Sequence, residues 1–477
     1  MTRSLNRLTA ALLVAFLIMA ASVVYWSVFA SGDLLRRSQN PRNIEFEQTL
    51  RRGAIYDRNG QVLAQTIDAG QSGSGKVLAR RDYPQPDALS AIGYYSLAQG
   101  GILVHGGIEE AFDSTLRGDD QLDAGQRALN DLLHHPQIGS DVRLTLDLPL
   151  QSAIVTALKS YNGAVIVVDV PSGAVRAMVS VPSFNPATLD QTFAQLLKDP
   201  SAPLVNRVIQ GTYQPGSALE TVVLSALLTD KVPLDSAVVA TDTPLQFDDL
   251  MLPCNLNGAS PTLQNAYAMD CPQPFALAAF EHRANVQQAI EAFGLLRPPA
   301  LAHFKTQTGV PPSPLYALAD DKVLLGRQGA GQGSLTVTPL QMAIVAATVA
   351  NHGNAVSLHM ADATRPPGST SWQPLNVAAD QPAVTSQSVA TLLRTAMRAA
   401  VTNGTAHAAD RDGLTIYGHA SFALSGPKNN AISWFIGFVD LPNGNSIATA
   451  VVLENTRDPP AAALIGGAAL QASVGIK

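Results

Sequence analysis

The chain has 477 residues, of which 46% are hydrophobic and 14% carry a charge. Disordered chains show the opposite balance, so this composition excludes global disorder. The 31 lysines and arginines against 37 aspartates and glutamates give a net charge of −6, which argues against a nucleic-acid-binding protein. Two cysteines exclude a disulfide-rich scaffold and most structural zinc sites.

The N-terminal region contains a long uncharged segment at residues 8–30. A helix of this length measures ~35 Å and can cross the ~30 Å hydrocarbon core of a bilayer. Arg3 and Arg7 precede it, so a cleaved signal peptide is the alternative, but the apolar core of a signal peptide is usually only ~7–15 residues long. We therefore predict a cytoplasmic tail at 1–7 and a single transmembrane helix at 8–30.

Beyond this segment, apolar patterns predict strands at both ends of an α+β domain with helices between them. Residues 31–139 are mixed and polar. The glycine-rich stretch 70–76 nearly matches a phosphate-binding loop, but Val77 lacks the hydroxyl of that motif, so we interpret the stretch as a plain loop. The runs 164–170 and 175–181 flank a Ser-Gly turn and predict a hairpin. Other expected elements are strands at 142–146, 433–439 and 446–453, helices at 148–160, 219–228 and 341–349, and an exposed loop rich in Pro, Ser and Thr at 361–384.

Several segments, taken in order, resemble a known family. They are residues 52–64 (RGAIYDRNGQVLA), 107–116 (GIEEAFDSTL), 144–147 (LTLD) with Gln151, 206–217 (NRVIQGTYQPGS), 331–333 (GQG), 338–343 (TPLQMA) and 434–438 (WFIGF). Their order and spacing resemble the class B penicillin-binding proteins, membrane-anchored D,D-transpeptidases that cross-link peptidoglycan. The resemblance implies a small pedestal or dimerisation-like domain at 31–139. It also implies a transpeptidase-like domain at 140–477, similar to the serine β-lactamases, with helices packed on an antiparallel sheet.

The first motif of that family is Ser-x-x-Lys at the start of a helix, where this spacing puts the amine on the same face as the hydroxyl whose proton it takes. Here the segment is Ser217-Ala218-Leu219-Glu220, so the nucleophile position is kept and the lysine position holds a carboxyl group. Ser-x-x-Glu is also the capping-box pattern, and we predict that Ser217 and Glu220 cap the helix. As a base, Glu220 would be weak at its free pKa of ~4.3, although burial could raise that value.

The other two motifs also depart from the family. Ser-x-Asn corresponds to Asp270-Cys271-Pro272, and Lys-[Ser/Thr]-Gly corresponds to Leu424-Ser425-Gly426, followed by Pro427. Pro427 has no N–H, so one oxyanion donor would be missing, a loss that typically costs ~3–4 kcal/mol of barrier. Lys428 could supply the lost charge only after a shift in register. The positions that the resemblance assigns to substrate binding are Asp270, Pro272, Leu424, Ser425, Gly426 and Pro427.

These losses lead us to predict a non-catalytic pseudo-transpeptidase that acts by binding in peptidoglycan synthesis, cell division or the control of cell shape. The alternative is an active D,D-transpeptidase that forms an acyl-enzyme on Ser217 with a non-standard base, taken from Glu220, Asp270 or Lys428. A third hypothesis is a sensor that binds peptidoglycan stem peptides or β-lactams without turnover. The resemblance implies a cell-membrane location with the bulk of the chain extracytoplasmic. It also implies a membrane glycan polymerase or a divisome protein as partner, and no nucleic acid, cofactor or metal is expected.

Two smaller features remain open from the sequence. Cys254 and Cys271 can pair in an oxidising compartment, where the bridge would contribute ~3 kcal/mol, or they can be two buried thiols. His407 and His419 lie near the third motif, and we expect both to be structural.

Overall fold

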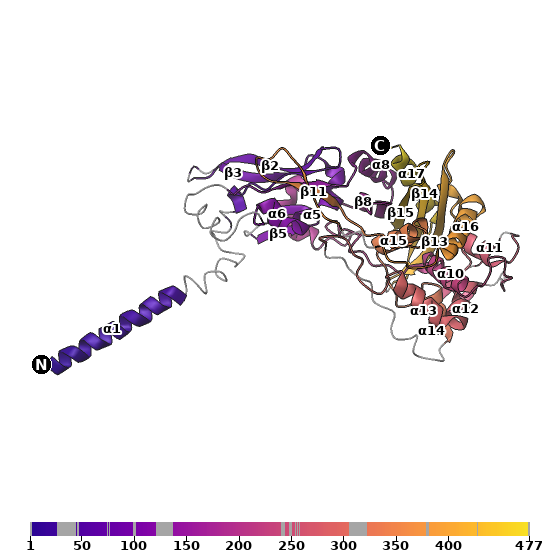
Figure 1. The fold of residues 1–477 in the computed structure, drawn as a ribbon, viewed down its shortest axis with the longest axis horizontal. Helices are drawn as coiled ribbons and strands as arrows, with labels where there is room; N and C mark the ends of the chain where they lie inside the picture. Colours follow the sequence, from indigo (N-terminus) through magenta and orange to yellow (C-terminus); the bar gives the residue numbers. More distant parts are fainter. Residues whose placement is uncertain are drawn as a thin grey trace.

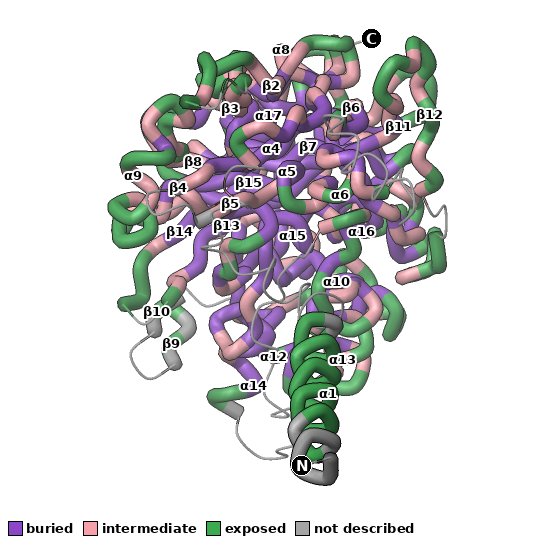
Figure 2. The backbone as a smooth tube through the Cα atoms, turned by 90° about the vertical axis from the view of Figure 1, so that its left-hand side faces the viewer, coloured by how far each residue is buried: buried purple, intermediate pink, exposed green. Residues whose placement is uncertain are grey.

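The computed structural model describes residues 2–25, 44, 47–73, 75, 77–98, 102–120, 137–239, 244–247, 250–252, 254, 256, 258–304, 322–377, 381–426 and 428–475. Its first element is α1 (Thr2–Val24), which overlaps the predicted anchor, whereas residues 26–30 of that prediction lie outside the described residues. Leu13 and Leu17 on α1 are exposed. Figure 2 shows most of the described part of α1 in the colour of exposed residues. Across the described ranges, no helix has both the length and the apolar character needed to cross a membrane.

The centre of the larger part of the chain is a five-stranded antiparallel sheet (Figure 1). Its strands, in spatial order, are β13 (Thr415–Ser425), β14 (Asn430–Asp440), β15 (Ser446–Leu453), β7 (Gly163–Asp169) and β8 (Val175–Val181). The predicted hairpin at 164–181 and the two predicted C-terminal strands are therefore confirmed. All eight residues of β15 are buried, which agrees with the continuous apolar runs that mark a sheet covered on both faces.

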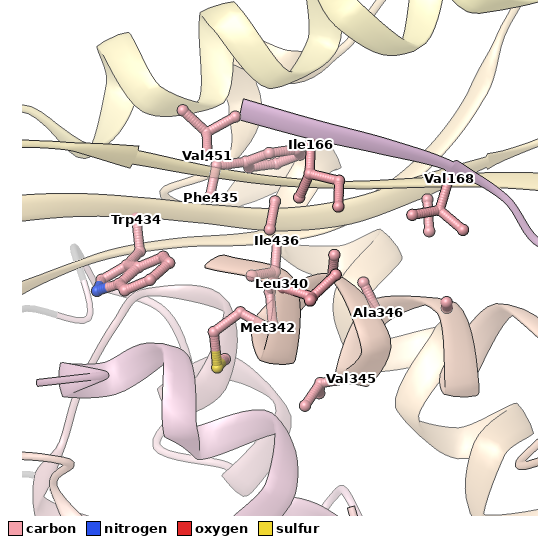
Figure 3. Packing of buried hydrophobic residues seen from close by; sticks show 14 of the residues in the cluster. Ile166, Val168, Leu340, Met342, Val345, Ala346, Trp434, Phe435, Ile436 and Val451 are labelled. Atoms are coloured by element: carbon pink, nitrogen blue, oxygen red, sulfur yellow. The ribbon is translucent and has the colours of Figure 1, made fainter. Parts of the chain in front are cut away.

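Helices cover both faces of this sheet (Figure 3). On one face lies α15 (Pro339–Ala350), which begins with a capping box formed by Thr338 and Gln341. On the other face lies α17 (Pro459–Val474), where Gly466 allows close contact, because a Cβ atom there would meet the Phe435 ring at 2.1 Å. The expected α+β arrangement, with helices packed on an antiparallel sheet, is thus confirmed.

A second sheet of six strands joins distant parts of the chain. Its strands, in spatial order, are β12 (Gln373–Pro374), β11 (Ala361–Arg365), β6 (Asp141–Leu144), β1 (Ile55–Tyr56), β2 (Val62–Gln71) and β3 (Val77–Asp82). The expected exposed loop at 361–384 is therefore wrong in part. Ion pairs Arg143–Asp362 (2.9 Å) and Arg365–Asp141 (2.5 Å) link β11 to β6, a long-range pairing that the local Pro and Ser content cannot reveal.

The remaining elements surround these two sheets. They are η2 (Pro86–Ala88), α4 (Leu89–Ile92), β4 (Tyr94–Ala98), β5 (Ile102–Gly106), α5 (Ile108–Ala111), α6 (Asp113–Arg117), α8 (Leu148–Ala157), η3 (Pro186–Thr188), α9 (Leu189–Leu196), η4 (Gly216–Leu219), α10 (Glu220–Thr229), β9 (Leu245–Phe247), β10 (Leu250–Leu252), α11 (Leu263–Ala268), α12 (Gln273–Glu281), α13 (Arg283–Ala292), α14 (Lys322–Gly329), α16 (Gln387–Asn403) and η6 (His407–Ala409).

A buried ion cluster connects two of the segments that carried the family resemblance. Arg52 contacts Glu109 at 3.0 Å and Asp113 at 2.5 Å, and Arg81 contacts the other oxygen of Glu109 at 2.6 Å. The side chains of Arg52, Arg81 and Glu109 are at most 3% exposed. Burial alone would raise the pKa of Glu109, but the two guanidinium groups outweigh burial and lower it.

Candidate functional site

Ser217 lies in a tight turn between the central sheet and α10. The turn is η4, and it begins at Gly216, the residue directly before Ser217. Gly216 has a φ of +54°, a backbone conformation that favours glycine. The Gly216 amide donates a hydrogen bond to the carbonyl of Gly331 at 2.9 Å, and a Cβ atom on Gly216 would lie 2.4 Å from the carbonyl oxygen of Phe422 on β13. The strand and the turn are therefore in direct contact, and Ser217 is only 4% exposed.

The predicted capping box at this position is wrong. Ser217 lies inside the 3₁₀ turn η4. The helix α10 begins at Glu220, its N-cap residue is Leu219, and no side chain of the described residues caps it. Both carboxyl oxygens of Glu220 lack a hydrogen-bond partner among the described residues. A capping serine needs a non-helical backbone, and here the turn continues directly into the helix, so the pattern of residues matches a cap while the backbone does not.

Three ionisable side chains converge beside Ser217. The ligand atoms of Glu220 on α10, Asp270 after α11 and His419 on β13 all lie within 4.8 Å of one another. Glu220 and His419 are fully buried and Asp270 is 9% exposed. The imidazole Nε2 of His419 lies 3.9 Å from Glu220 Oε2, beyond hydrogen-bond distance. Within the part of the chain that the structure describes, neither ring nitrogen of His419 has a hydrogen-bond partner, and neither has Asp270 Oδ1.

Burial dominates the electrostatics of this cluster. It raises the pKa of Glu220 well above the usual range, and the nearby Asp270 carboxylate raises it further. Burial also raises the pKa of Asp270 to about 7, although the Ser217 hydroxyl and the Arg457 charge act in the opposite direction. The Ser217 hydroxyl also lowers the pKa of Glu220, but by less than burial raises it. Burial lowers the pKa of His419 to about 3, so the imidazole is neutral.

Residues of the second motif border this cluster. Cys271 forms a disulfide with Cys254, with Cα atoms 4.3 Å apart, which settles the question that the sequence left open. Pro272 directly precedes α12 and is buried. Asp270 has a φ of +57°, a left-handed conformation that an aspartate adopts more readily than most residues.

Residues of the third motif are held by glutamine side chains. The amide of Gln214, three residues before Ser217, accepts hydrogen bonds through Oε1 from Ser425 Oγ at 2.8 Å and from the Gly426 N–H at 3.1 Å. Gln332 Oε1 accepts one from the Leu424 N–H at 3.2 Å. A cavity of about 250 Å³ lies beside them and is lined by Gln214, Leu324, Arg327, Gln328, Gln332, Gly333, Ser334, Leu424 and Asn429.

The structure thus brings Ser217, Glu220 and Asp270 together, and it adds His419, which the sequence analysis expected to be merely structural. Pro427 lies outside the described residues, and Lys428 is exposed. One feature of the sequence could have indicated a role for His419: it lies in a largely apolar run that leads directly into the third motif. The cluster can hold a proton or a cation between its oxygens and nitrogens, and its two carboxyl groups disfavour an anionic ligand.

Comparisons with known proteins show the family and agree with the fold. The family model for the penicillin-binding protein transpeptidase domain matches residues 163–471. The peptidoglycan D,D-transpeptidase PbpA of Mycolicibacterium smegmatis is 30% identical over 503 residues, which cover 100% of this chain and 98% of the relative. Among solved structures, the imipenem acyl-enzyme complex of penicillin-binding protein A from M. tuberculosis has a TM-score of 0.76 and 26% identity, covering 90% of this chain and 100% of that one. A structure from a study of polymerization and crosslinking by a peptidoglycan synthase complex has a TM-score of 0.68 and covers 99% of this chain and 98% of that one, and at 20% identity this similarity concerns the fold alone.

Proposed function

Because the chain belongs to the family of penicillin-binding protein transpeptidase domains, we propose that it serves peptidoglycan synthesis as a non-catalytic member that acts by binding. The proposal rests on the burial of Ser217 at the nucleophile position and on the loss of the lysines that surround it in the family. Ser217 is 4% exposed, and the two positions at which the family has lysine hold Glu220 and Leu424. A serine hydroxyl needs both an approach path for the substrate and a base that takes its proton.

The side chains around Ser217 support this proposal. Glu220 stands where the family has the lysine that takes the serine proton, and burial raises the pKa of its carboxyl group, so this position carries no amine to act as that base. His419 is neutral, but a pKa of about 3 makes its imidazole a weak base. β13 packs closely against the turn at Gly216, where a Cβ atom would lie 2.4 Å from the carbonyl oxygen of Phe422.

One observation favours the alternative of an active D,D-transpeptidase. The pKa of Asp270, about 7, is close to the value that suits a general base at neutral pH. The Ser217 hydroxyl lowers the pKa of this carboxyl group, against the larger effect of burial. In this alternative, Asp270 would take the hydroxyl proton while Ser217 attacks the acyl group.

Labelled penicillin separates the two functions. The full chain, purified in a non-ionic detergent, is incubated with a fluorescent penicillin and compared with the Ser217→Ala variant. A Ser114→Ala variant serves as the control, since this exposed serine lies on α6, outside the three motifs. We expect no covalent label on any of the three proteins. Label on the wild type and on Ser114→Ala, but not on Ser217→Ala, would establish the acyl-enzyme and refute the non-catalytic proposal.

The placement of the protein forms a second part of the proposal. We infer a single-pass membrane anchor at 8–30, a pedestal at 31–139 and a transpeptidase-like domain at 140–477 outside the cytoplasm. The uncharged segment and the exposed leucines of α1 support the anchor. A membrane glycan polymerase or a divisome protein is the proposed partner, because the chain has the fold of a protein studied in a peptidoglycan synthase complex.

The anchor predicts where the chain is found in fractionated cells. The protein should stay in the membrane fraction after a high-salt or carbonate wash and should leave it when residues 1–31 are deleted. Release of the full chain by the wash would refute the anchor.

A further inference from the structure

The cluster beside Ser217 leaves an unusual number of buried polar atoms without partners among the described residues. These atoms are both carboxyl oxygens of Glu220, Asp270 Oδ1 and both ring nitrogens of His419. Buried polar groups in proteins are nearly always hydrogen-bonded, and each one that is not destabilises the fold. Their ligand atoms nevertheless share one small volume, within 4.8 Å of one another.

We propose that Glu220, Asp270 and His419 form a binding site for a divalent transition-metal ion of the zinc type. The inference rests on the proposed function, because a metal site here replaces the proton-transfer chemistry of the family with a structural or ligand-binding centre.

The charge and the types of ligand support a transition metal. Two ionised carboxylates and one neutral imidazole carry a charge of about −2, which a divalent cation neutralises inside a buried site. Imidazole nitrogen suits zinc and its neighbours, whereas magnesium and calcium prefer oxygen ligands alone. A lysine at position 220 or 424 would oppose a cation by charge repulsion, and here these positions hold Glu220 and Leu424.

The ligand atoms of the three side chains, within 4.8 Å of one another, are farther apart than they would be around a bound zinc ion. Zinc binds oxygen and nitrogen at ~2.0–2.2 Å, so ligand atoms on one ion lie ~3.3–3.6 Å apart. The separation of 3.9 Å between His419 Nε2 and Glu220 Oε2 is close to that range, so small side-chain rotations would bring both atoms into coordination. Three protein ligands and one open position are typical of zinc sites that bind a further ligand.

Neighbouring side chains hold the imidazole in place. The His419 ring stacks on Tyr267, with centroids 4.4 Å apart and planes 25° apart. The Tyr267 hydroxyl in turn lies 2.8 Å from Thr221 Oγ1 on α10, the residue after Glu220. Two of the three ligands therefore belong to one packed unit, which limits the reorganisation that metal binding requires.

Metal binding is tested with the full chain in detergent, after treatment with a chelator and removal of the chelator. Zinc is titrated by calorimetry, and cobalt is added separately, because its visible absorption reports coordination by nitrogen and oxygen. We expect one zinc ion per chain. Glu220→Gln and His419→Gln should weaken binding at least ~100-fold, since loss of even an outer partner of a ligand typically weakens metal affinity ~10–100-fold.

A surface variant controls for adventitious binding. His282 and Asp230 form an exposed pair, with Nδ1 2.6 Å from a carboxyl oxygen, and His282→Gln should leave the zinc affinity unchanged. Circular dichroism checks that each variant is folded, and Glu220→Gln is nearly isosteric, so it keeps the test valid even if His419→Gln does not fold. Absence of stoichiometric binding, or a loss of binding only in His282→Gln, would overturn the inference.

Penicillin labelling with and without chelator separates this inference from the proposed function. Zinc binding without label supports both. Label together with zinc binding would leave the metal site standing and refute the non-catalytic proposal. Absence of both would refute the metal site alone.

Discussion

Replacing Glu220 by methionine should stabilise the metal-free protein. The carboxyl group of Glu220 is fully buried, neither oxygen has a hydrogen-bond partner within the described ranges, and Asp270 adds repulsion that raises its pKa. Methionine has a similar volume and no polar group to desolvate. The same substitution would destabilise the protein if Glu220 were part of a helix cap, because a lost cap costs ~0.5–2 kcal/mol. The sign of the change therefore distinguishes the two interpretations.

The magnitude follows from the number of unsatisfied groups. Removing a buried polar group that lacks partners recovers ~1–3 kcal/mol of desolvation free energy. Replacement of buried charged groups by apolar residues of similar volume has stabilised other proteins by ~1–4 kcal/mol. For a domain of this size, ~1 kcal/mol shifts the melting temperature by about 2 °C, so we expect Glu220→Met to raise it by about 2–6 °C.

Thermal unfolding in the presence of a chelator measures this effect, and Glu454→Met is the matched control. Glu454 Oε1 accepts hydrogen bonds from Arg207 Nε at 3.0 Å and from the Tyr213 hydroxyl at 2.7 Å. The same substitution there should lower stability by ~1–3 kcal/mol, because it leaves two donors unpaired. If Glu220→Met lowers the melting temperature as Glu454→Met does, the carboxyl group of Glu220 is a stabilising partner and the reasoning is wrong.

Three further predictions concern the scaffold. Arg52→Ala should destabilise the protein by ~3–5 kcal/mol because it removes one of the two guanidinium groups that pair with the buried carboxyl group of Glu109. Arg51→Ala, which breaks an exposed ion pair, should change the free energy of unfolding in urea by less than ~1 kcal/mol, and equal effects would contradict the role of burial. Reduction of Cys254–Cys271 should lower stability by ~3 kcal/mol, and a double Cys→Ser variant that melts like the oxidised wild type would refute this. The pKa of Glu109 is lowered in the folded state, so its contribution to stability is complete above its ordinary pKa of about 4.5 and is lost as pH falls through the lower folded value. Glu109→Gln should therefore reduce the pH dependence of the free energy of unfolding below pH ~4.5. An unchanged pH dependence would contradict this prediction.

Much of the fold was predictable from local patterns. The hairpin of β7 and β8 and the C-terminal strands β14 and β15 follow from apolar runs that are too long and too β-branched for loops. The strand β11 could not be found this way. Three of its five residues are polar, and its pairing with β6 includes charge pairs between residues more than 200 positions apart in sequence, which no local pattern contains.

The candidate site was predictable in part of its membership but not in its local geometry. The family motifs single out Glu220 and Asp270, and the structure brings these two side chains together with His419, which was expected to be structural. The capping box failed because Ser-x-x-Glu specifies a cap only when the serine has a non-helical backbone, and η4 extends the helical turn through Ser217. The pairing of His419 with Glu220 depends on the contact between β13 and α10, which is a property of the packed fold.

The stability of Glu220→Met also links the buried carboxyl group to the proposed metal site. In chelator the variant should be the more stable protein, by ~1–3 kcal/mol. Zinc at a concentration about 1,000-fold above its Kd would stabilise the wild type by about 4.1 kcal/mol, while the variant has lost a ligand and gains little. The two melting temperatures should therefore cross as zinc is added, whereas magnesium at the same concentration should move neither. If the carboxyl group of Glu220 is buried without partners but binds no metal, the two melting temperatures should not cross. Melting temperatures that change in parallel as zinc is added would therefore refute the metal site and leave the burial argument intact.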